Sequence, residues 1–318
     1  MNRIYTLLLF FILVNSVCFA QVTDYRVQFS MLTLKGDSTE IVSLRSFTLN
    51  SKKSFLCVNP KDCSTYIVPE DRVASVQALN FLSFIRTSKA CLYKTLYVTA
   101  SKRNTYLENA GLTRKITSQQ GIYVTIDLCP SLKPLDRALF DSIISIFDST
   151  QRPIPIAISL AGSWTKAHTD DLKWLKQWDD SKTLEIEWIN HSLHHFVSDT
   201  LPLKKNYLLR PSTNLEKEIL GNEVLMINHG LVPSVFFRFP GLVSNADIFE
   251  RVLKYGLIPL GTDAWLAKKQ KPTNGSIVLI HGNENEPRGV TQFYRLLSSK
   301  KASIRIDSWR FISLRDSL

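Results

Sequence analysis

Long apolar runs are scarce in this sequence of 318 residues. Beyond Ala20, no segment is apolar over enough length to span a bilayer. The sequence has neither an internal repeat nor a low-complexity tract, which sets aside repeat architectures and biased linkers. A Gly-x-Ser-x-Gly turn is also missing, since the nearest stretch, Ala161-Gly162-Ser163-Trp164-Thr165, lacks the second glycine. A serine hydrolase with that nucleophile is therefore excluded.

The one dense apolar run lies near the start of the chain, from Leu7 to Val14, and Arg3 precedes it. Ala20 provides a small residue just before Gln21, as a signal-peptide cleavage site requires. We therefore predict a signal peptide over residues 1–20 and a periplasmic or secreted protein. An uncleaved membrane anchor is the alternative.

Basic residues outnumber acidic residues by 39 to 28, which gives a formal net charge of +11. They come in small groups, such as Lys204-Lys205 and Lys300-Lys301, and form no stripe interleaved with aromatic residues. A nucleic-acid partner is therefore not expected. The net charge favours contact with anionic envelope polymers. Basic side chains scattered over a solvated surface would give the same net charge.

Cysteine is sparse, with five residues, and Cys18 lies in the predicted signal peptide. An oxidising compartment permits disulfides among the others, and Cys57 and Cys63 flank a turn-prone segment that a bridge would close. Free buried thiols are an equally good interpretation. The spacing does not match a zinc knuckle.

Two regions differ in hydrophobic pattern. Residues 21–118 show irregular strand-like pieces and then a helical stretch over 72–86, which predicts a small β-rich or mixed extension packed on the main domain. In residues 119–318, strand-like and helical patterns alternate, which is typical of an α/β parallel sheet covered by helices. Six or seven such units favour a barrel, complete or incomplete, over an open sheet. The predicted strands are Gly121–Ile126, Ile154–Leu160, Leu184–Ile189, Val235–Phe239, Leu257–Gly261, Ser276–Ile280 and Ser303–Ile306.

Polar residues follow five of these strands at the point where each strand ends. Because the carboxyl ends of parallel strands open on one face of a barrel, we expect these side chains to gather there. A buried carboxylate or imidazole needs a partner to offset its desolvation, and these residues would be partners for one another. They are Asp127, His191, Arg238, Asp263 and His281.

Half of the chain's 6 histidines lie in one short segment, and two of these, His191 and His195, stand four residues apart. If the chain is helical there, both imidazoles share one face and can bind one metal ion. The pair by itself is a weak signal, but the polar residues at the other strand ends strengthen it. Together they predict metal-assisted hydrolysis.

Each polar residue has a role in that chemistry. Asp127 is the base that takes the proton of water, or else a third metal ligand, and Arg238 holds its carboxylate ionised. His281 is the acid that protonates the leaving group. Asp263 would raise the pKa of His281 and keep it protonated.

Five segments, in chain order, resemble the five motifs of the polysaccharide deacetylases of the NodB homology type, which form carbohydrate esterase family four. They are Thr125-Ile126-Asp127-Leu128-Cys129-Pro130, His191-Ser192-Leu193-His194-His195, Arg238-Phe239-Pro240-Gly241, Asp263-Ala264-Trp265 and Leu279-Ile280-His281-Gly282. The resemblance covers residues from Gly121 to about Ser298. It implies a distorted (β/α)7 barrel that removes N- or O-acetyl groups from glycans. It also implies a divalent metal, zinc first, with cobalt, nickel or manganese as alternatives.

The first motif departs from the family's Thr-Phe-Asp-Asp-Gly-Pro. The resemblance makes Asp127 the base, but the family's second Asp, a metal ligand, is replaced by Leu128, which cannot bind a metal. His191 and His195 are implied as ligands, and we expect Asp127 near the ion as the third. The alternatives for that position are His194, Asn190 and water.

Three other residues in these motifs have expected roles or open ones. Trp265 follows Asp263 on the active face and is expected to form a wall of the acetyl pocket, and Pro240 is expected to contact substrate. Cys129 is either a soft metal ligand or a plain buried thiol.

The sequence therefore predicts an exported metal-dependent hydrolase whose substrate is an acetylated glycan. The alternative is a non-catalytic glycan-binding protein on the same barrel, with Leu128 marking a degraded metal site. A hydrolase of another amide or ester is a further hypothesis, since one scaffold hosts several related chemistries.

Overall fold

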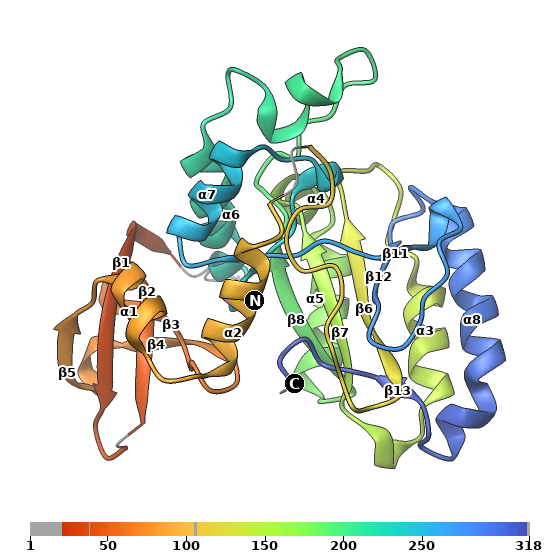
Figure 1. Ribbon diagram of the computed structural model, residues 1–318, viewed down its shortest axis with the longest axis horizontal. Helices are drawn as coiled ribbons and strands as arrows, with labels where there is room; N and C mark the ends of the chain where they lie inside the picture. Colours follow the sequence, from red (N-terminus) through yellow and green to blue (C-terminus); the bar gives the residue numbers. More distant parts are fainter. Residues whose placement is uncertain (1–20, 38, 105–106, 317–318) are drawn as a thin grey trace, which may run out of the picture.

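The computed structural model describes residues 21–37, 39–104 and 107–316 (Figure 1). The predicted signal peptide over residues 1–20 lies outside the described residues. Among the residues described, no helix is both long and apolar enough to cross a membrane. The four cysteines in these ranges, Cys57, Cys63, Cys91 and Cys129, are all free thiols, so the bridge between Cys57 and Cys63 is not formed.

The N-terminal region is an antiparallel sheet of five strands in the order β4-β3-β2-β1-β5. Its strands are β1 (Val22–Leu34), β2 (Glu40–Leu49), β3 (Lys52–Val58), β4 (Thr65–Pro69) and β5 (Val73–Ala78). Two helices follow, α1 (Phe81–Thr87) and α2 (Leu92–Ser101). The helix predicted over 72–86 is wrong in its first half, because residues 73–78 pair with the free edge of β1. The Asn80 side chain, which accepts a hydrogen bond from the Ser83 amide, sets the start of α1.

The main domain is a parallel sheet curled into a half-barrel, which confirms the predicted fold class. Its strand order is β10-β9-β8-β7-β6-β12-β11, and β13 pairs with β6 off that path. The strands are β6 (Gly121–Leu128), β7 (Ile154–Leu160), β8 (Leu184–Asn190), β9 (Phe236–Phe237), β10 (Ile258–Pro259), β11 (Ala264–Trp265), β12 (Ile277–His281) and β13 (Arg310–Phe311). The helices are α3 (Arg137–Ile146), α4 (Gly162–Ala167), α5 (Thr169–Asp180), α6 (Leu215–Asn228), α7 (Ala246–Lys254) and α8 (Pro287–Arg305).

The predicted last strand, Ser303–Ile306, is wrong. Residues 303–305 instead form the last turn of α8, a helix of 19 residues whose apolar side packs on the sheet. Phe293 and Leu297 of α8 share a buried cluster with Phe140 of α3 and Leu175 of α5. These helices therefore cover one face of the parallel sheet, as Figure 1 shows for α3 and α8.

The gap between the edge strands β10 and β11 is bridged by the segment that leads into the main domain. The Leu112 amide donates to the Pro259 carbonyl at 2.9 Å, and the Gly261 amide donates to the Leu112 carbonyl at 2.7 Å. Further along, the Lys115 amide donates to the Gly275 carbonyl at 3.1 Å. The half-barrel is thus completed in part by chain that precedes it.

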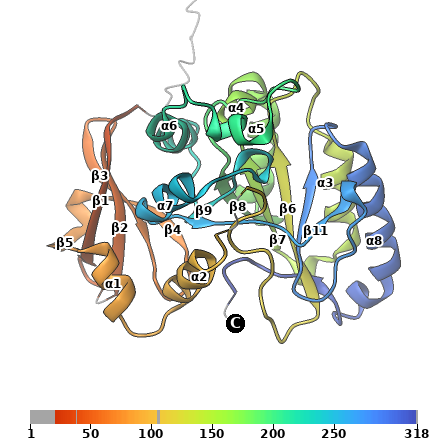
Figure 2. The same ribbon diagram turned by 45° about the horizontal axis from the view of Figure 1, so that its top comes forward.

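The antiparallel sheet is fastened to the main domain by a buried ion pair. The guanidinium of Arg45 in β2 donates to both carboxylate oxygens of Glu223 in α6, at 2.8 and 3.0 Å. Both side chains are fully buried. Tyr25 also donates to Glu223, at 2.9 Å. One apolar cluster contains residues of both regions, including Tyr93 of α2 and Phe249 of α7. Figure 2 shows the two regions side by side.

Candidate metal-binding active site

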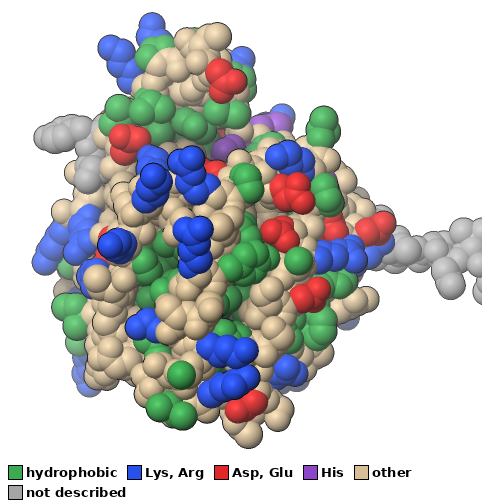
Figure 3. All heavy atoms as spheres, turned by 90° about the vertical axis from the view of Figure 1, so that its right-hand side faces the viewer, with side chains coloured by type: hydrophobic (Ala, Val, Ile, Leu, Met, Phe, Trp, Pro, Cys, Tyr) green, Lys and Arg blue, Asp and Glu red, His purple; other side chains and the backbone are tan. Residues whose placement is uncertain are grey.

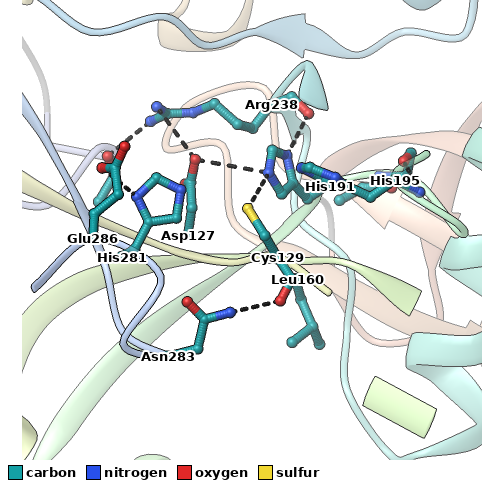
Figure 4. Close-up of polar contacts among 12 residues, drawn as sticks. Asp127, Cys129, Leu160, His191, His195, Arg238, His281, Asn283 and Glu286 are labelled. Carbon is teal, nitrogen blue, oxygen red and sulfur yellow. Dashed lines mark hydrogen bonds and ion pairs between the residues drawn. The ribbon is translucent and has the colours of Figure 1, made fainter. Parts of the chain in front are cut away.

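The ends of strands β6, β8, β9 and β12 bring four of the predicted site residues together. In the sheet register, Asp127 at the end of β6 pairs with His281 at the end of β12. On the other side of β6, strands β7 and β8 end at Leu160 and Asn190, which pair with each other. His191 follows β8, and Arg238 follows β9. Figure 4 shows the resulting cluster of polar side chains.

Asp127 lies at the centre of this cluster and is buried. Its Oδ2 atom lies 3.7 Å from His191 Nε2 and 4.0 Å from Arg238 Nη1. Burial raises the pKa of Asp127. The charges of Arg238, His191 and His281 lower it by more than burial raises it, so the net pKa is below the ordinary value. The carboxylate is therefore ionised at neutral pH, as a general base requires. Its Oδ1 atom is buried and has no hydrogen-bond partner within the described chain.

The segment from His191 to His195 is a tight loop and not a helix. Ser192 and His195 both have positive φ angles, 67° and 49°. Side chains hold this conformation: Asn190 Oδ1 accepts from the Ser192 amide at 3.0 Å, and Ser192 Oγ accepts from the His195 amide at 3.1 Å. The loop still brings the two imidazoles together, with ring centroids 4.6 Å apart. His194 is exposed and pairs with Glu218 at 2.6 Å.

The proton of His191 is placed by the backbone. Its Nδ1 lies 2.9 Å from the carbonyl oxygen of Arg238, which can only accept, so Nδ1 carries the hydrogen. The other nitrogen, Nε2, then faces Asp127 and the sulfur of Cys129, which lies 3.5 Å away. Such a fixed tautomer is typical of a metal-binding histidine.

Three potential ligands converge beside Asp127. One ligand atom each from Cys129, His191 and His195 lies within 4.8 Å of the others, and all three residues are buried. Both ring nitrogens of His195 are buried without a partner in the described part of the chain. A thiolate and two imidazoles are the donor set of zinc, so these residues fit the implied metal. The predicted ligands His191 and His195 are thus brought together, and Cys129 joins them in this group rather than Asp127.

The surroundings of Cys129 favour the ionised thiolate over the neutral thiol. Burial raises its pKa, but His195 and His281 and a hydrogen bond to His191 lower it more, so the net pKa lies well below the ordinary value. The carbonyl of Cys129 is held by Asn283, whose side-chain amide donates to it at 2.6 Å. The thiolate is the form of cysteine that binds metals.

His281 pairs with a residue that the motif comparison did not identify. Its Nδ1 lies 2.8 Å from Oε2 of Glu286, at the start of α8. The same oxygen accepts a hydrogen bond from the indole nitrogen of Trp265 at 2.7 Å. Glu286, and not Asp263, is therefore the carboxylate that faces His281.

Asp263 lies apart from this group. Its Oδ2 accepts from Arg114 Nε at 2.7 Å, and its Oδ1 accepts from the Ile277 amide at 3.1 Å. The expected pairing of Asp263 with His281 is corrected accordingly, because Asp263 is engaged in holding the bridging segment against β12.

The two residues expected to contact substrate occupy different environments. The Trp265 ring is half-buried, 6.4 Å from the His281 ring between centroids, with Lys268 Nζ 3.9 Å from its centroid on one face. It also lines a pocket of 180 Å³ beside the site. Pro240 is buried at the start of a 3-10 turn directly after Arg238 and Phe239.

The sequence did not indicate the contacts that two further residues make near the site. Glu286 lies in the loop between His281 and α8, and nothing in a loop sequence indicates which carboxylate turns inward. Tyr207 comes from a separate segment, and its ring lies edge-on to His195 with centroids 6.0 Å apart. The Tyr207 ring also packs closely on Gly241, where a Cβ would lie 2.4 Å from the ring. The glycine at position 241 is the one sequence feature related to this contact.

Comparisons with known proteins give the following. No protein-family model matches the chain. It is similar to a family 4 carbohydrate esterase from Bacillus anthracis, with 17% identity and a TM-score of 0.46 over 71% of this chain and 91% of that one. The chain is also similar to a CE4 family pseudoenzyme from the same organism, with 14% identity and a TM-score of 0.44 over 65% of this chain and 68% of that one. A third similar structure is a family 4 carbohydrate esterase from Streptomyces lividans in complex with acetate. It has 15% identity and a TM-score of 0.42 over 62% of this chain and 93% of that one. These proteins are of the family that the five sequence motifs resemble.

Proposed function

We propose that this protein is an exported metal-dependent hydrolase that removes acetyl groups from an envelope or extracellular glycan. One observation carries the proposal: an ionised carboxylate, Asp127, and an imidazole, His281, lie beside a group of buried residues that can bind a metal. The base and the acid are thus next to each other at the ends of paired strands. Metal-assisted hydrolysis of an amide or ester needs both.

His191 and His195 would hold the cation together with a third residue, Asp127 or Cys129. A divalent ion, zinc first, would supply Lewis acidity toward the substrate carbonyl and toward water when it is bound there. Cobalt, nickel and manganese are the alternatives. The remaining residues of the site act by position and charge.

Asp127 takes the proton of the attacking water. The low pKa that Arg238 and His191 impose on it, against the effect of burial, keeps it ionised for this role. Arg238 has its guanidinium fully buried, with Nη2 donating to Thr125 Oγ1 at 2.8 Å, so its charge has a fixed place beside the carboxylate. A fixed charge costs no reorganisation during the reaction.

His281 delivers a proton to the departing amine or alcohol. Its net pKa lies well above the ordinary value, although burial lowers it, because Cys129, Glu286 and Asp127 together raise it. The ring is therefore an imidazolium at neutral pH. The half-buried Trp265 ring beside it offers an apolar wall for a methyl group.

The surface charge is compatible with a glycan in an anionic envelope. Figure 3 shows lysine and arginine side chains spread among the other types on one face, with histidine side chains near its upper edge. Contact with anionic polymers would follow from the net charge of +11. Export would follow from cleavage before Gln21, and intact-mass analysis of the secreted protein would test it.

The alternative is a non-catalytic protein that binds glycan on the same barrel. The observation that favours it is Leu128, which occupies the position of a family metal ligand. It predicts glycan binding that survives a chelator and survives His191→Ala.

The test is release of acetate from chitin oligosaccharides, peptidoglycan and acetylated xylan, with zinc, cobalt, nickel or manganese added. We expect release from at least one substrate, and loss of about a hundredfold or more in Asp127→Asn and in His281→Asn. His194→Gln is the matched control, since this exposed histidine shares the loop of His191 but pairs with Glu218. No release with any metal from any of these substrates would overturn the proposal.

A further inference from the structure

The end of β6 presents alternate residues to opposite faces of the sheet. Successive side chains of a strand point to opposite sides, so residues 127 and 129 share one side and residue 128 takes the other. The burial pattern agrees. Leu128 is fully buried in the cluster formed with Phe140 of α3 and Phe293 of α8, beneath the helices. Position 128 therefore faces the helical layer, and Cys129 faces the site.

Cys129 meets both histidines on that side. Its sulfur lies 3.5 Å from His191 Nε2, the ring nitrogen that does not face the Arg238 carbonyl. One atom from each of the three residues lies within 4.8 Å of the others. Both ring nitrogens of His195, a residue only 6% exposed, have no partner in the described ranges. A buried imidazole without a partner loses the hydrogen bonds it would make in water, unless a ligand supplies the missing contact.

Asp127 faces a cation through one of its oxygens, Oδ2, while Oδ1 has no hydrogen-bond partner among the described residues. Its Oδ2 faces both Arg238 and His191, at 4.0 and 3.7 Å, so its charge is already balanced by a buried guanidinium. Figure 4 shows its sulfur directed at His191 and Asp127 placed between Arg238 and His191.

We propose that Cys129 is the third metal ligand, so that this chain holds its cation through one thiolate and two imidazoles. The inference rests on the proposed function only in taking a divalent metal to be resident at this site. Asp127 is thereby left as the base and not as a ligand. The thiolate supplies a negative charge to the site from the residue directly after β6, on the side of the sheet that Leu128 does not face.

A sulfur ligand changes which metals the site accepts. Thiolates favour soft and borderline ions such as zinc and cobalt over manganese and magnesium, which prefer oxygen. We therefore expect the isolated protein to contain zinc. With manganese we expect weak binding, in contrast to a site of two histidines and a carboxylate.

The experiment uses the mature chain from Gln21, loaded with Co(II), and records the absorption spectrum. A thiolate bound to Co(II) gives an intense charge-transfer band in the near ultraviolet, which a site of imidazole and carboxylate lacks. We expect this band in the wild type and about one equivalent of bound metal. The band is read on the unaltered protein, so the test does not depend on any variant folding.

Variants then assign the band. In Cys129→Ser we expect the band to disappear and the affinity for zinc to fall by at least about tenfold. In Asp127→Asn we expect the band and the zinc affinity to be retained. The matched control is Cys91→Ser, which removes another free thiol. Bound cobalt without the band in the wild type would overturn the proposal. So would loss of metal in Asp127→Asn with full retention in Cys129→Ser.

The outcomes separate this inference from the proposed function. A charge-transfer band with one equivalent of metal, but no acetate release from any substrate, would support Cys129 as a ligand and contradict the proposed deacetylase activity. Acetate release with bound cobalt and no band sinks the thiolate ligand alone. Failure of the wild type to bind any metal sinks both.

Discussion

The carboxylate of Glu286 lies 2.8 Å from Nδ1 of His281 and accepts a hydrogen bond from the indole of Trp265 with the same oxygen. These three residues come from β12, β11 and the start of α8. The carboxylate favours a proton on Nδ1 and orients the ring so that Nε2 is turned to the other site residues. Glu286 thus acts on the substrate only through His281, as a positioning residue.

Replacing Glu286 by Gln should lower kcat by about tenfold to a hundredfold, because the acid loses the charge that holds it protonated. KM should change little, since Glu286 is expected to act through His281. Glu286→Asp should recover part of the loss. Glu284→Gln is the control, because Glu284 lies exposed in the same loop. Equal losses in both variants would show that the loop as a whole matters and not this ion pair.

The same variant should shift the pH profile of kcat. Burial lowers the pKa of His281, and Cys129, Glu286 and Asp127 raise it to a net value well above the ordinary one. Activity that needs the protonated ring is lost as pH rises through this raised pKa. Without the charge of Glu286 the pKa falls, so the alkaline limb should move to lower pH in Glu286→Gln. An unchanged alkaline limb would contradict the assignment of His281 as the acid.

The sequence was sufficient to predict that the residues at the strand ends lie close together, because the carboxyl ends of parallel strands meet at one edge of the sheet. Asp127, His191, Arg238 and His281 each follow a recognisable apolar run, and the sheet register then brings them to one edge. The rest depended on details that no periodicity encodes. Asp263 turns away because Arg114, from a distant segment, offers it a closer charge.

The loop that contains the two histidines shows the same limit. Spacing of four residues would bring the two imidazoles together on a helix, yet side-chain hydrogen bonds from Asn190 and Ser192 stabilise positive φ angles instead. The two imidazoles meet all the same. Their proximity was thus predicted for a reason that the structure does not use. The ion pair between Arg45 and Glu223 joins two regions far apart in sequence, and no local pattern could have indicated it.

That ion pair should contribute strongly to stability. Arg45→Met would leave the Glu223 carboxylate buried without its cation, and removal of one partner of a buried pair costs about 3–5 kcal/mol. Chemical denaturation should show a loss of this size. The control is Lys53→Met, which breaks a half-exposed pair with Glu70 and should cost less than about 1 kcal/mol. Similar losses in the two variants would mean that Arg45 does not fasten the N-terminal sheet.

Glu187 should make stability depend on pH. Burial raises its pKa to about 7, in spite of its ion pair with Arg315 at 2.8 Å. The folded state therefore holds this proton more tightly than the unfolded state, whose pKa is near 4.5. The contribution to stability is complete below the unfolded pKa and declines as pH rises toward 7.

Replacing Glu187 by Gln removes this dependence. The free energy of unfolding of Glu187→Gln, relative to wild type, should increase between pH 4.5 and 7 by about 2–3 kcal/mol and then level off. Urea denaturation across that range measures it. Glu185→Gln is the control, because Glu185 contacts the same Arg315 but is more exposed. A difference between Glu187→Gln and wild type that stays flat with pH would contradict the raised pKa.

Leu128→Asp tests whether the missing family carboxylate could simply be restored. Sequence alignment alone predicts that this change recreates a metal ligand. The structure predicts the opposite, because Leu128 is fully buried in the apolar cluster beneath the helices. A carboxylate there would be buried in an apolar cluster without a cation, so the variant should lose about 3 kcal/mol or more of stability. Thermal unfolding and zinc content together decide the matter. A variant that unfolds at the wild-type temperature and binds zinc without need of Cys129 would show that position 128 reaches the site after all.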